Sequence, residues 1–233
     1  MSAEILTERL FESLISGDRP AARAVVEDAF REGANAEVVI NDLLWPTYEQ
    51  IERFFRDDNM TTLAHHMGTR MLRVLVDQCA LKLQRHPSRD RTVFAVCGPT
   101  DADELGAQIA VDMLEAEGYH VNFAAGGIAP DEILNHTQQN KPDVLLLFAS
   151  SPSDLPGTRW LIDTIREIGA CDGTQIVVGG GVFNRAEGLA EEIGADLWAE
   201  SPLELCEVMA DNPERRAPAT QRTVGRKARR GAA

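Results

Sequence analysis

Residues 92–106 run TVFAVCGPTDADELG, and this stretch decides the class of fold. The first six residues are mostly apolar and β-prone, as in a strand buried on both faces of a parallel sheet. Gly98 and Pro99 end that strand, and the polar residues after them are typical of a helix N-terminus. A strand that leads directly into a helix is the first unit of a parallel α/β domain.

The same alternation of apolar runs and helical stretches continues to Asp211. It predicts five strands with amphipathic helices between them, at 92–97, 121–124, 144–149, 175–178 and 196–199. We therefore expect a five-stranded parallel sheet of the flavodoxin or Rossmann kind. Ligands bind beyond the carboxyl ends of the strands in such sheets. The segments that follow the first, third and fourth strands are therefore the places where a site is expected.

The first 86 residues predict a four-helix bundle. Gly17 ends a first helix, and Asp18 begins a second one that Gly33 ends. A third helix is expected over 36–56, with a kink after Trp45 because Pro46 lacks a backbone N–H. Thr61 is expected to cap a fourth helix that continues to His86. Short connections favour antiparallel packing of these helices. The predicted domains are thus 1–86 and 92–211, followed by a basic, disordered tail over 212–233.

Charge is distributed unevenly along the chain, which has a net charge of −14. Seven basic residues and one acid follow Pro213, so 16 basic residues face 36 acidic ones in the rest of the chain. Such an acidic body repels nucleic acid. Only the tail is expected to contact polyanions, and only weakly, through Arg215, Arg216, Arg222, Arg226, Lys227, Arg229 and Arg230.

The N-terminus shows no secretory signal, and no stretch reaches the roughly 18 apolar residues of a membrane span. The expected location is the cytoplasm, without membrane contact. The four cysteines are widely spaced, which favours buried free thiols over a zinc site or a disulfide framework. The composition leaves open whether the protein is a monomer or a homodimer joined through the bundle.

Two of the segments beyond the strands attract attention. Residues 98–106 contain glycines at a strand-to-helix turn, but Asp101, Asp103 and Glu104 would repel a pyrophosphate there. Helix capping is the structural alternative for these acids. The run Gly179-Gly180-Gly181 removes three side chains in succession and lets a broad, flat ligand or another backbone approach.

This arrangement resembles the cobalamin-binding modules of corrinoid proteins, methionine synthases and light-sensing repressors, over almost the whole chain up to Asp211. In that family a DxHxxG motif follows the first strand, and its histidine binds cobalt from below. Asp101 and Gly106 match the motif, whereas Asp103 stands in place of the histidine. The family's SxL element falls near Phe148 and is lost, unless Ser150 or Ser151 replaces its serine. The family's GG element matches Gly179 and Gly180.

The bundle supplies a second comparison. Light-sensing and methionine-synthase-like members carry a tryptophan and, ten positions later, Glu-His above the corrin. Here Phe55 takes the place of the tryptophan, and His65-His66 takes the place of Glu-His. The resemblance implies that either histidine could bind cobalt from above, since neutral imidazole is a good ligand. An exposed histidine pair is the structural alternative.

The resemblance implies a corrinoid held between the bundle and the α/β domain without a lower histidine, with its nucleotide tail along the glycine run. A sensor, regulatory or carrier module fits this picture, with a regulator or a methyltransferase subunit as partner. An independent enzyme is not indicated, because no catalytic motif is recognisable. Two alternatives remain: a degenerate module without cofactor that acts as a protein-interaction adaptor, and a haem-binding variant with His65, His66 or His120 as ligand. The predicted cofactor-binding residues are Phe55, His65, His66, Thr100, Asp101, Asp103, Gly106, Ser150, Ser151, Gly179, Gly180 and Gly181, with His65 and His66 as candidate metal ligands.

Overall fold

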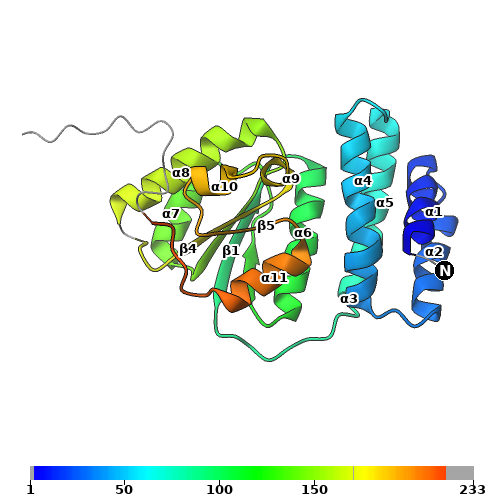
Figure 1. Cartoon of the computed structure of the whole chain (residues 1–233), viewed down its shortest axis with the longest axis horizontal. Helices are drawn as coiled ribbons and strands as arrows, with labels where there is room; N and C mark the ends of the chain where they lie inside the picture. Colours follow the sequence, from blue (N-terminus) through cyan, green and yellow to red (C-terminus); the bar gives the residue numbers. More distant parts are fainter. Residues whose placement is uncertain (1–2, 170, 219–233) are drawn as a thin grey trace, which may run out of the picture.

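The computed structural model describes residues 3–169 and 171–218, which form a helical part and an α/β part side by side (Figure 1). The helical part comprises α1 (Ala3–Ser16), α2 (Arg19–Arg31), α3 (Ala36–Val39), the π-helical turn η1 (Ile40–Leu44), α4 (Trp45–Arg56) and α5 (Thr62–Ala80). The sheet comprises β1 (Thr92–Cys97), β2 (His120–Phe123), β3 (Val144–Phe148), β4 (Gln175–Gly179) and β5 (Leu197–Ala199). Its helices are α6 (Asp101–Ala116), α7 (Pro130–Asn140), the short 3-10 helix η2 (Pro152–Asp154), α8 (Leu155–Ile168), α9 (Gly181–Asn184), α10 (Leu189–Glu192) and α11 (Pro202–Asp211).

The expected helix boundaries of the bundle are mostly found. The Asp18 side chain accepts a hydrogen bond from the Ala21 N–H at 3.0 Å and so caps α2. The Thr61 hydroxyl caps α5 in the same way, through the Ala64 N–H at 3.2 Å. Gly17 and Gly33 follow the ends of α1 and α2 with positive φ, a backbone conformation that glycine adopts at little cost.

The third predicted helix is interrupted where Pro46 stands. The turn before the proline is π-helical, and the Trp45 N–H donates to the Ile40 carbonyl one residue further back than in an α-helix. Pro46 then sits in the first turn of α4, where a missing N–H does no harm. The kink expected at this position therefore takes the form of a widened turn.

The fourth helix is shorter than expected, because α5 ends at Ala80 and not near His86. The backbone N–H groups of His86 and Arg89 donate to the Ala116 and Gly118 carbonyls at 2.7 and 2.9 Å. The chain leaves the helix early because these residues are tied to the far end of α6. The prediction that the helix runs to His86 was wrong for this tertiary reason.

The sheet is fully parallel, with the strand order β2-β1-β3-β4-β5 of a flavodoxin-like domain. The five predicted strands are found with ends that differ by about one residue. The main departure from the regular pattern follows β4, where two single-turn helices, α9 and α10, replace a long helix.

Two hydrophobic clusters cover the two faces of the sheet. One joins the sheet to α6, α11 and the bundle, with Leu105 and Ile109 of α6 fully buried. The other packs the opposite face against α7, α8, α9 and α10, with Ile162 of α8 at its centre. Helix α6 therefore lies between the sheet and α4 and α5, as Figure 1 shows. The bundle and the α/β domain share one continuous core.

Polar contacts align α5 with α6 across the domain boundary. The Arg73 guanidinium donates to the Gln108 side chain at 3.0 Å and to the Asp101 carbonyl at 2.9 Å. Gln108 in turn donates to the Asp77 carboxylate at 2.6 Å. These bonds fix the bundle in register with the first α/β helix and thereby position the site.

The first residues of the predicted tail are ordered against the sheet. The Gln175 amide donates to the Asn212 and Arg215 carbonyls, and Arg216 donates to the Gly173 carbonyl at 2.7 Å. The order expected to end at residue 211 thus extends to about residue 217. The basic residues from Arg222 onward lie outside the described residues. No helix in the described ranges is long and apolar enough to cross a membrane.

Candidate functional site

A cavity of about 900 Å³ lies between α4 and α5 of the bundle and the carboxyl ends of the strands. This volume is at the upper end of the range for pockets that bind small molecules and cofactors. The position agrees with the rule that ligands of parallel sheets bind beyond the carboxyl ends. Nine of the predicted site residues line it: Phe55, His65, His66, Thr100, Asp101, Asp103, Ser150, Ser151 and Gly181.

The bundle forms the roof of this cavity. The rings of Phe55 and His65 are stacked, with centroids 3.9 Å apart and planes 17° apart. His65 Nε2 lies 2.7 Å from a carboxylate oxygen of Glu52, and His65 Nδ1 is enclosed without a partner among the described residues. His66 is exposed and lines the cavity. His65 therefore offers no accessible ring nitrogen in this conformation, whereas His66 does.

The floor contains Asp103, which occupies the place of the motif histidine. Asp103 is buried, and its carboxylate accepts hydrogen bonds from the Thr100 hydroxyl at 2.6 Å and the Thr100 N–H at 3.2 Å. The Asp103 N–H donates to the Thr100 hydroxyl at 3.1 Å, which completes a capping box at the start of α6. The carboxylate is thus committed to the helix N-terminus.

The loop after β3 completes the floor. The Ser150 hydroxyl is buried and has no hydrogen-bond partner in the described residues. The Ser151 hydroxyl accepts from the Ser153 N–H and caps the short helix η2. Of the two serines, Ser150 is therefore the one whose hydroxyl does not cap a helix, and it is buried near the Tyr48 phenol.

The three consecutive glycines after β4 differ in what a side chain at each position would contact. A side chain at Gly180, which has a φ of 103°, would collide with the Ala149 backbone. A Cβ at Gly181 would lie 2.6 Å from the Arg185 guanidinium. A Cβ at Gly179 would meet only ordinary contacts, and this residue borders a second, much smaller cavity together with Gly180. The backbone approach predicted for the run is confirmed at Gly180.

Gly106 lines neither cavity. A Cβ there would lie 2.5 Å from the Tyr48 phenol oxygen and 2.7 Å from Phe148 Cζ. Tyr48 comes from the bundle, so Gly106 provides room for the contact between the two domains. The structural role of Gly106 is therefore to allow the two domains to pack closely.

Tyr48 is a site residue that the sequence analysis missed. Its hydroxyl donates to the Ala102 carbonyl at 3.1 Å, at the start of α6. Burial raises the pKa of Tyr48 well above its usual value, and the negative charges of Glu52 and Asp103 raise it further. The phenol therefore stays protonated. The available signal was spacing, since Trp45, Tyr48, Glu52 and Phe55 recur on one face of α4.

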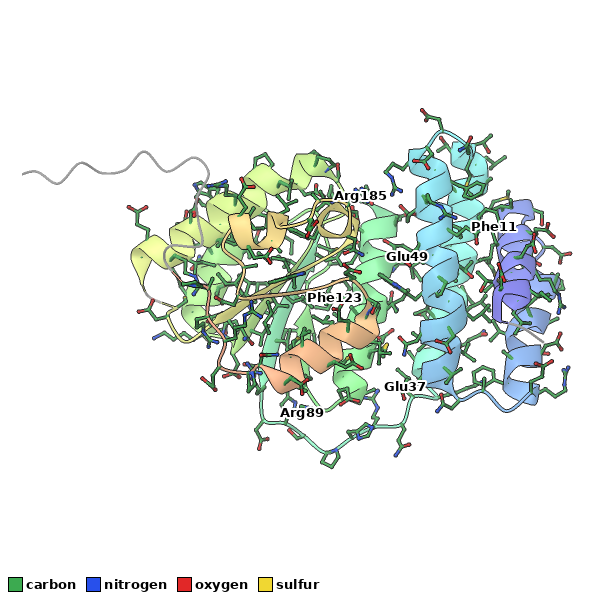
Figure 2. The ribbon with its side chains drawn as sticks, in the orientation of Figure 1. Phe11, Glu37, Glu49, Arg89, Phe123 and Arg185 are labelled. Atoms are coloured by element: carbon green, nitrogen blue, oxygen red, sulfur yellow. The ribbon has the colours of Figure 1, made fainter. Side chains whose placement is uncertain are left out.

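Two arginines at the edge of the cavity were also missed. Arg56 ends α4, and Arg185 directly follows α9, so that they come from different domains. Arg185 donates to the Ser150 carbonyl at 2.7 Å. Figure 2 shows Arg185 and Glu49 between the two parts of the molecule. No local motif marks these arginines, because the fold alone brings them together.

His120, the third histidine considered as a haem ligand, is remote from the cavity. It begins β2, so it lies at the amino end of the sheet, whereas the cavity lies at the carboxyl ends. Its Nε2 lies 3.0 Å from the Ser88 hydroxyl. The parallel arrangement of the strands therefore excludes His120 as a ligand in this cavity.

The fold and the cavity define a two-domain ligand-holding module, with a helical roof over a flavodoxin-like floor. The sequence model of the B12 binding domain matches residues 91–207, a little over half of the chain, and a second B12 binding domain model matches residues 6–80. The chain therefore belongs to the B12-binding domain family, whose cofactor is cobalamin. This confirms the resemblance, the predicted fold and the predicted class of cofactor.

Individual relatives agree with the family match. The chain is 25% identical over 212 residues to a dimethylamine corrinoid protein of Methanosarcina barkeri, and the alignment covers 88% of this chain and 95% of that protein. It is 23% identical over 211 residues to a corrinoid protein of Desulfitobacterium hafniense, and that alignment covers 87% of this chain and 95% of the other. The solved monomethylamine corrinoid protein of Methanosarcina barkeri shares the fold, with a TM-score of 0.79, 16% identity and coverage of 90% and 99%.

Proposed function

We propose that this protein holds cobalamin in the interdomain cavity and acts as the corrinoid-carrying subunit of a methyltransferase system. The cavity of about 900 Å³ carries this proposal, because it is large and has a flat aromatic roof and a polar floor. These features suit a broad macrocycle with amide groups around its rim. Bound cobalamin supplies a cobalt ion that can accept and release a methyl group. The corrinoid protein relatives favour a carrier over the predicted sensing or regulatory role.

On the roof, we infer that His66 is the residue that could bind the cobalt of a bound cobalamin. It is exposed toward the cavity, and among the described residues its ring nitrogens have no hydrogen-bond partner. His65 is held by Glu52 and supports the Phe55 ring, so its proposed role is to shape the roof. A carboxylate that binds one nitrogen of a histidine also fixes the orientation of the ring.

On the floor, none of the described residues that line the cavity is a histidine. Asp103 is a hard oxygen donor that the Thr100 capping box already binds. We therefore propose that Asp103 would not serve as a ligand to the metal of a bound cobalamin. The tasks left to the floor are to support the ring, through Ser150 and Ser151, and to exclude bulk water.

The test is reconstitution. The purified protein is mixed with hydroxocobalamin in the dark and desalted, and its visible spectrum is recorded. We expect retained cobalt bands with the wild type, and weaker retention or a shifted spectrum with His66→Ala. His65→Ala serves as the neighbouring comparison and should alter the spectrum less.

Loss of all cobalamin on desalting would contradict the proposal. The same experiment with haemin checks the haem alternative, which a retained Soret band would favour. If neither cofactor stays bound, the remaining interpretation is a protein-interaction adaptor that has no cofactor. A methyltransferase partner is checked separately, by transfer of a methyl group from the reconstituted protein to or from a candidate enzyme.

A further inference from the structure

Helix α8 lies on the face of the sheet opposite the bundle and has a solvent-facing side that is partly apolar (Figure 1). Trp160 is 46% exposed and Ile168 is 49% exposed. Tryptophan is highly buried on average and is enriched at contact surfaces, so an indole with nearly half of its surface in water marks a candidate contact. The outer face of α8 consists of the residues that recur on this side at helical spacing: Pro156, Trp160, Asp163, Thr164, Glu167 and Ile168.

The outer face of α8 is also negatively charged between its two apolar residues. Asp163 lies 3.7 Å from Arg159, and no cation of the described residues lies within ion-pair distance of Glu167. Arg166, the neighbour of Glu167 in the chain, is bonded to the Asp196 carboxylate instead. A surface that combines an indole with carboxylates fits a basic peptide, because arginine binds both groups.

The described part of the chain ends beside this helix. The Ala217 N–H donates to the Asp196 carboxylate at 2.6 Å, and the Arg166 guanidinium of α8 donates to the same carboxylate at 2.6 Å. Arg216 donates to the Gly173 carbonyl, just beyond the end of α8. The rest of the chain, residues 219–233, therefore continues from a point next to the last turn of α8.

The length of residues 219–233 is sufficient to cover the outer face of α8. Trp160 precedes Ile168 by about two helical turns, which is about 12 Å along the axis. An extended chain advances about 3.3 Å per residue, so residues 219–226 alone can span about 26 Å. Basic residues of the segment can therefore reach both ends of the face.

The composition of the segment complements the charge of this face. None of the 37 acidic residues of the chain lies in 219–233, although the whole chain has a net charge of −14. The segment is therefore attracted to the acidic body of its own chain. Its basic residues are Arg222, Arg226, Lys227, Arg229 and Arg230.

The described residues just before the segment show the kind of contact that we expect. The guanidinium carbon of Arg215 lies over the Trp198 ring, 5.4 Å from its centroid. A guanidinium can stack on an aromatic ring and pair with a carboxylate at the same time, because it is planar and donates from its edge. Trp160, with Asp163 and Glu167 on the next turns of α8, offers both contacts to another arginine.

We propose that residues 219–233 dock on the outer face of α8 of the same chain, with arginine side chains over Trp160 and paired with Glu167 and Asp163. Each of these exposed contacts is weak, and the segment loses conformational freedom when it docks. The covalent link to Pro218 raises the effective concentration of the segment at the face. Docking is therefore partial, reversible and sensitive to salt, and it does not depend on a bound cofactor.

The experiment is fluorine NMR of protein labelled with 5-fluorotryptophan, which gives one signal each for Trp45, Trp160 and Trp198. Trp160→Phe assigns the signal of interest. The full chain is compared with a chain that ends at Pro218 and with a full chain whose five basic residues after Pro218 are glutamines. The Trp160 signal should shift in both altered proteins. The Trp45 and Trp198 signals should stay in place, which shows that both proteins are folded.

Salt and matched variants test the role of charge. The Trp160 shift should fall at least twofold in about 1 M NaCl, where the Debye length is only about 3 Å. Glu167→Gln should reduce it roughly twofold, the usual effect of one exposed ion pair. Glu27→Gln removes the same charge from the exposed surface of α2 and should leave it unchanged. Heparin should move the signal toward that of the shortened chain, because a polyanion competes for the basic residues.

Three results would overturn the inference. Identical Trp160 signals in the full and the shortened chain would show that the segment does not reach this face. Shifts at Trp45 or Trp198 in place of Trp160 would show that it binds elsewhere. A Trp160 shift that grows with protein concentration would show that the segment comes from a second copy of the chain.

Discussion

The floor and the roof of the interdomain cavity differ in what their polar side chains already bind. On the floor, Asp103 is bonded to both the hydroxyl and the N–H of Thr100. On the roof and the edge, His66 and Arg70 have no hydrogen-bond or ion-pair partner among the described residues, although both line the cavity. The floor thus uses its polar groups to fold the start of α6, whereas the roof keeps polar groups available. Ligand contacts that the family motif places below are expected above in this chain.

The largest effect is expected where floor and roof touch, at Gly106. The Cβ of Gly106→Ala would collide with Tyr48 and Phe148, and overpacking of this kind costs about 1–3 kcal/mol. The intrinsic gain from alanine in a helix, about 1 kcal/mol, offsets part of this cost. We expect a net loss of up to about 2 kcal/mol in the free energy of unfolding, measured by urea denaturation.

Gly68→Ala is the matched control for this variant. It lies within α5, and its Cβ would lie 3.4 Å from the nearest atom, a terminal carbon of Ile51. Its unfolding free energy should change by less than about 1 kcal/mol. Equal stability of the two variants would show that the contact of Tyr48 with Gly106 does not join the domains.

A smaller effect is expected from Asp103→Ala. The change removes the side chain of the capping box and a negative charge in the first turn of α6, which should cost about 1.5 kcal/mol. Because the carboxylate is not a proposed cobalt ligand, the visible spectrum of the reconstituted protein should stay the same. Asp101→Ala is the control for charge alone. A changed cobalt spectrum in Asp103→Ala only would place this carboxylate on the ligand side.

Asp112 tests the packing of α5 against α6 on which both halves of the site depend. Burial, together with the negative charges of Glu115 and Asp77, raises its pKa from 3.8 to about 6. A carboxyl with a raised pKa in the folded state stabilises the fold below pH 3.8, and this contribution is lost as the pH rises through about 6.

Asp112→Asn should therefore raise the free energy of unfolding at pH 7.5. The expected gain is about 1 kcal/mol, since partial exposure reduces the full effect of the pKa shift. The gain should shrink as the pH falls through 6 and vanish near pH 4. Thermal unfolding across this pH range measures it, and a gain that does not depend on pH would refute this explanation.

The smallest effect is expected from Glu49, which belongs to the bundle. Burial raises its pKa, and so does the negative charge of Glu200 in the α/β domain. Glu49→Gln removes this repulsion across the interface and should stabilise the protein by about 0.3 kcal/mol at pH 7, a small effect because solvent still reaches the partly exposed side chain and screens the repulsion. Careful thermal denaturation is the measurement. Destabilisation would show that the carboxylate has a favourable partner.

The local signals of the sequence were sufficient for most of the fold. Apolar runs such as 144–148 marked the strands, and Asp18 and Thr61 marked helix starts by their capping chemistry. The end of α5 was not predictable, because the contacts of the connector with the end of α6 determine it. The ordered chain was predicted to end at residue 211, but it continues further for a similar tertiary reason, since Gln175 binds the segment after α11.

The site was predictable only where a motif survived. Nine predicted residues line the cavity because each follows a strand or lies on the bundle face that the family resemblance indicated. Tyr48, Arg56 and Arg185 were missed because none belongs to a motif. The difference between His65 and His66 was equally hidden, because it depends on the position of Glu52 on the neighbouring helix.

The sequence by itself determined the order of elements, the parallel sheet, the acidic body and the loss of the motif histidine at Asp103. The first three properties follow from local periodicity, capping and composition, which act over a few residues, and the loss of the histidine follows from the comparison with the family motif. Only the tertiary structure decided that Gly106 faces Tyr48, that the cavity beside Gly179 and Gly180 is small, and that two arginines from different domains line one cavity. Such contacts join residues far apart in the chain, and their geometry depends on how the bundle packs against α6.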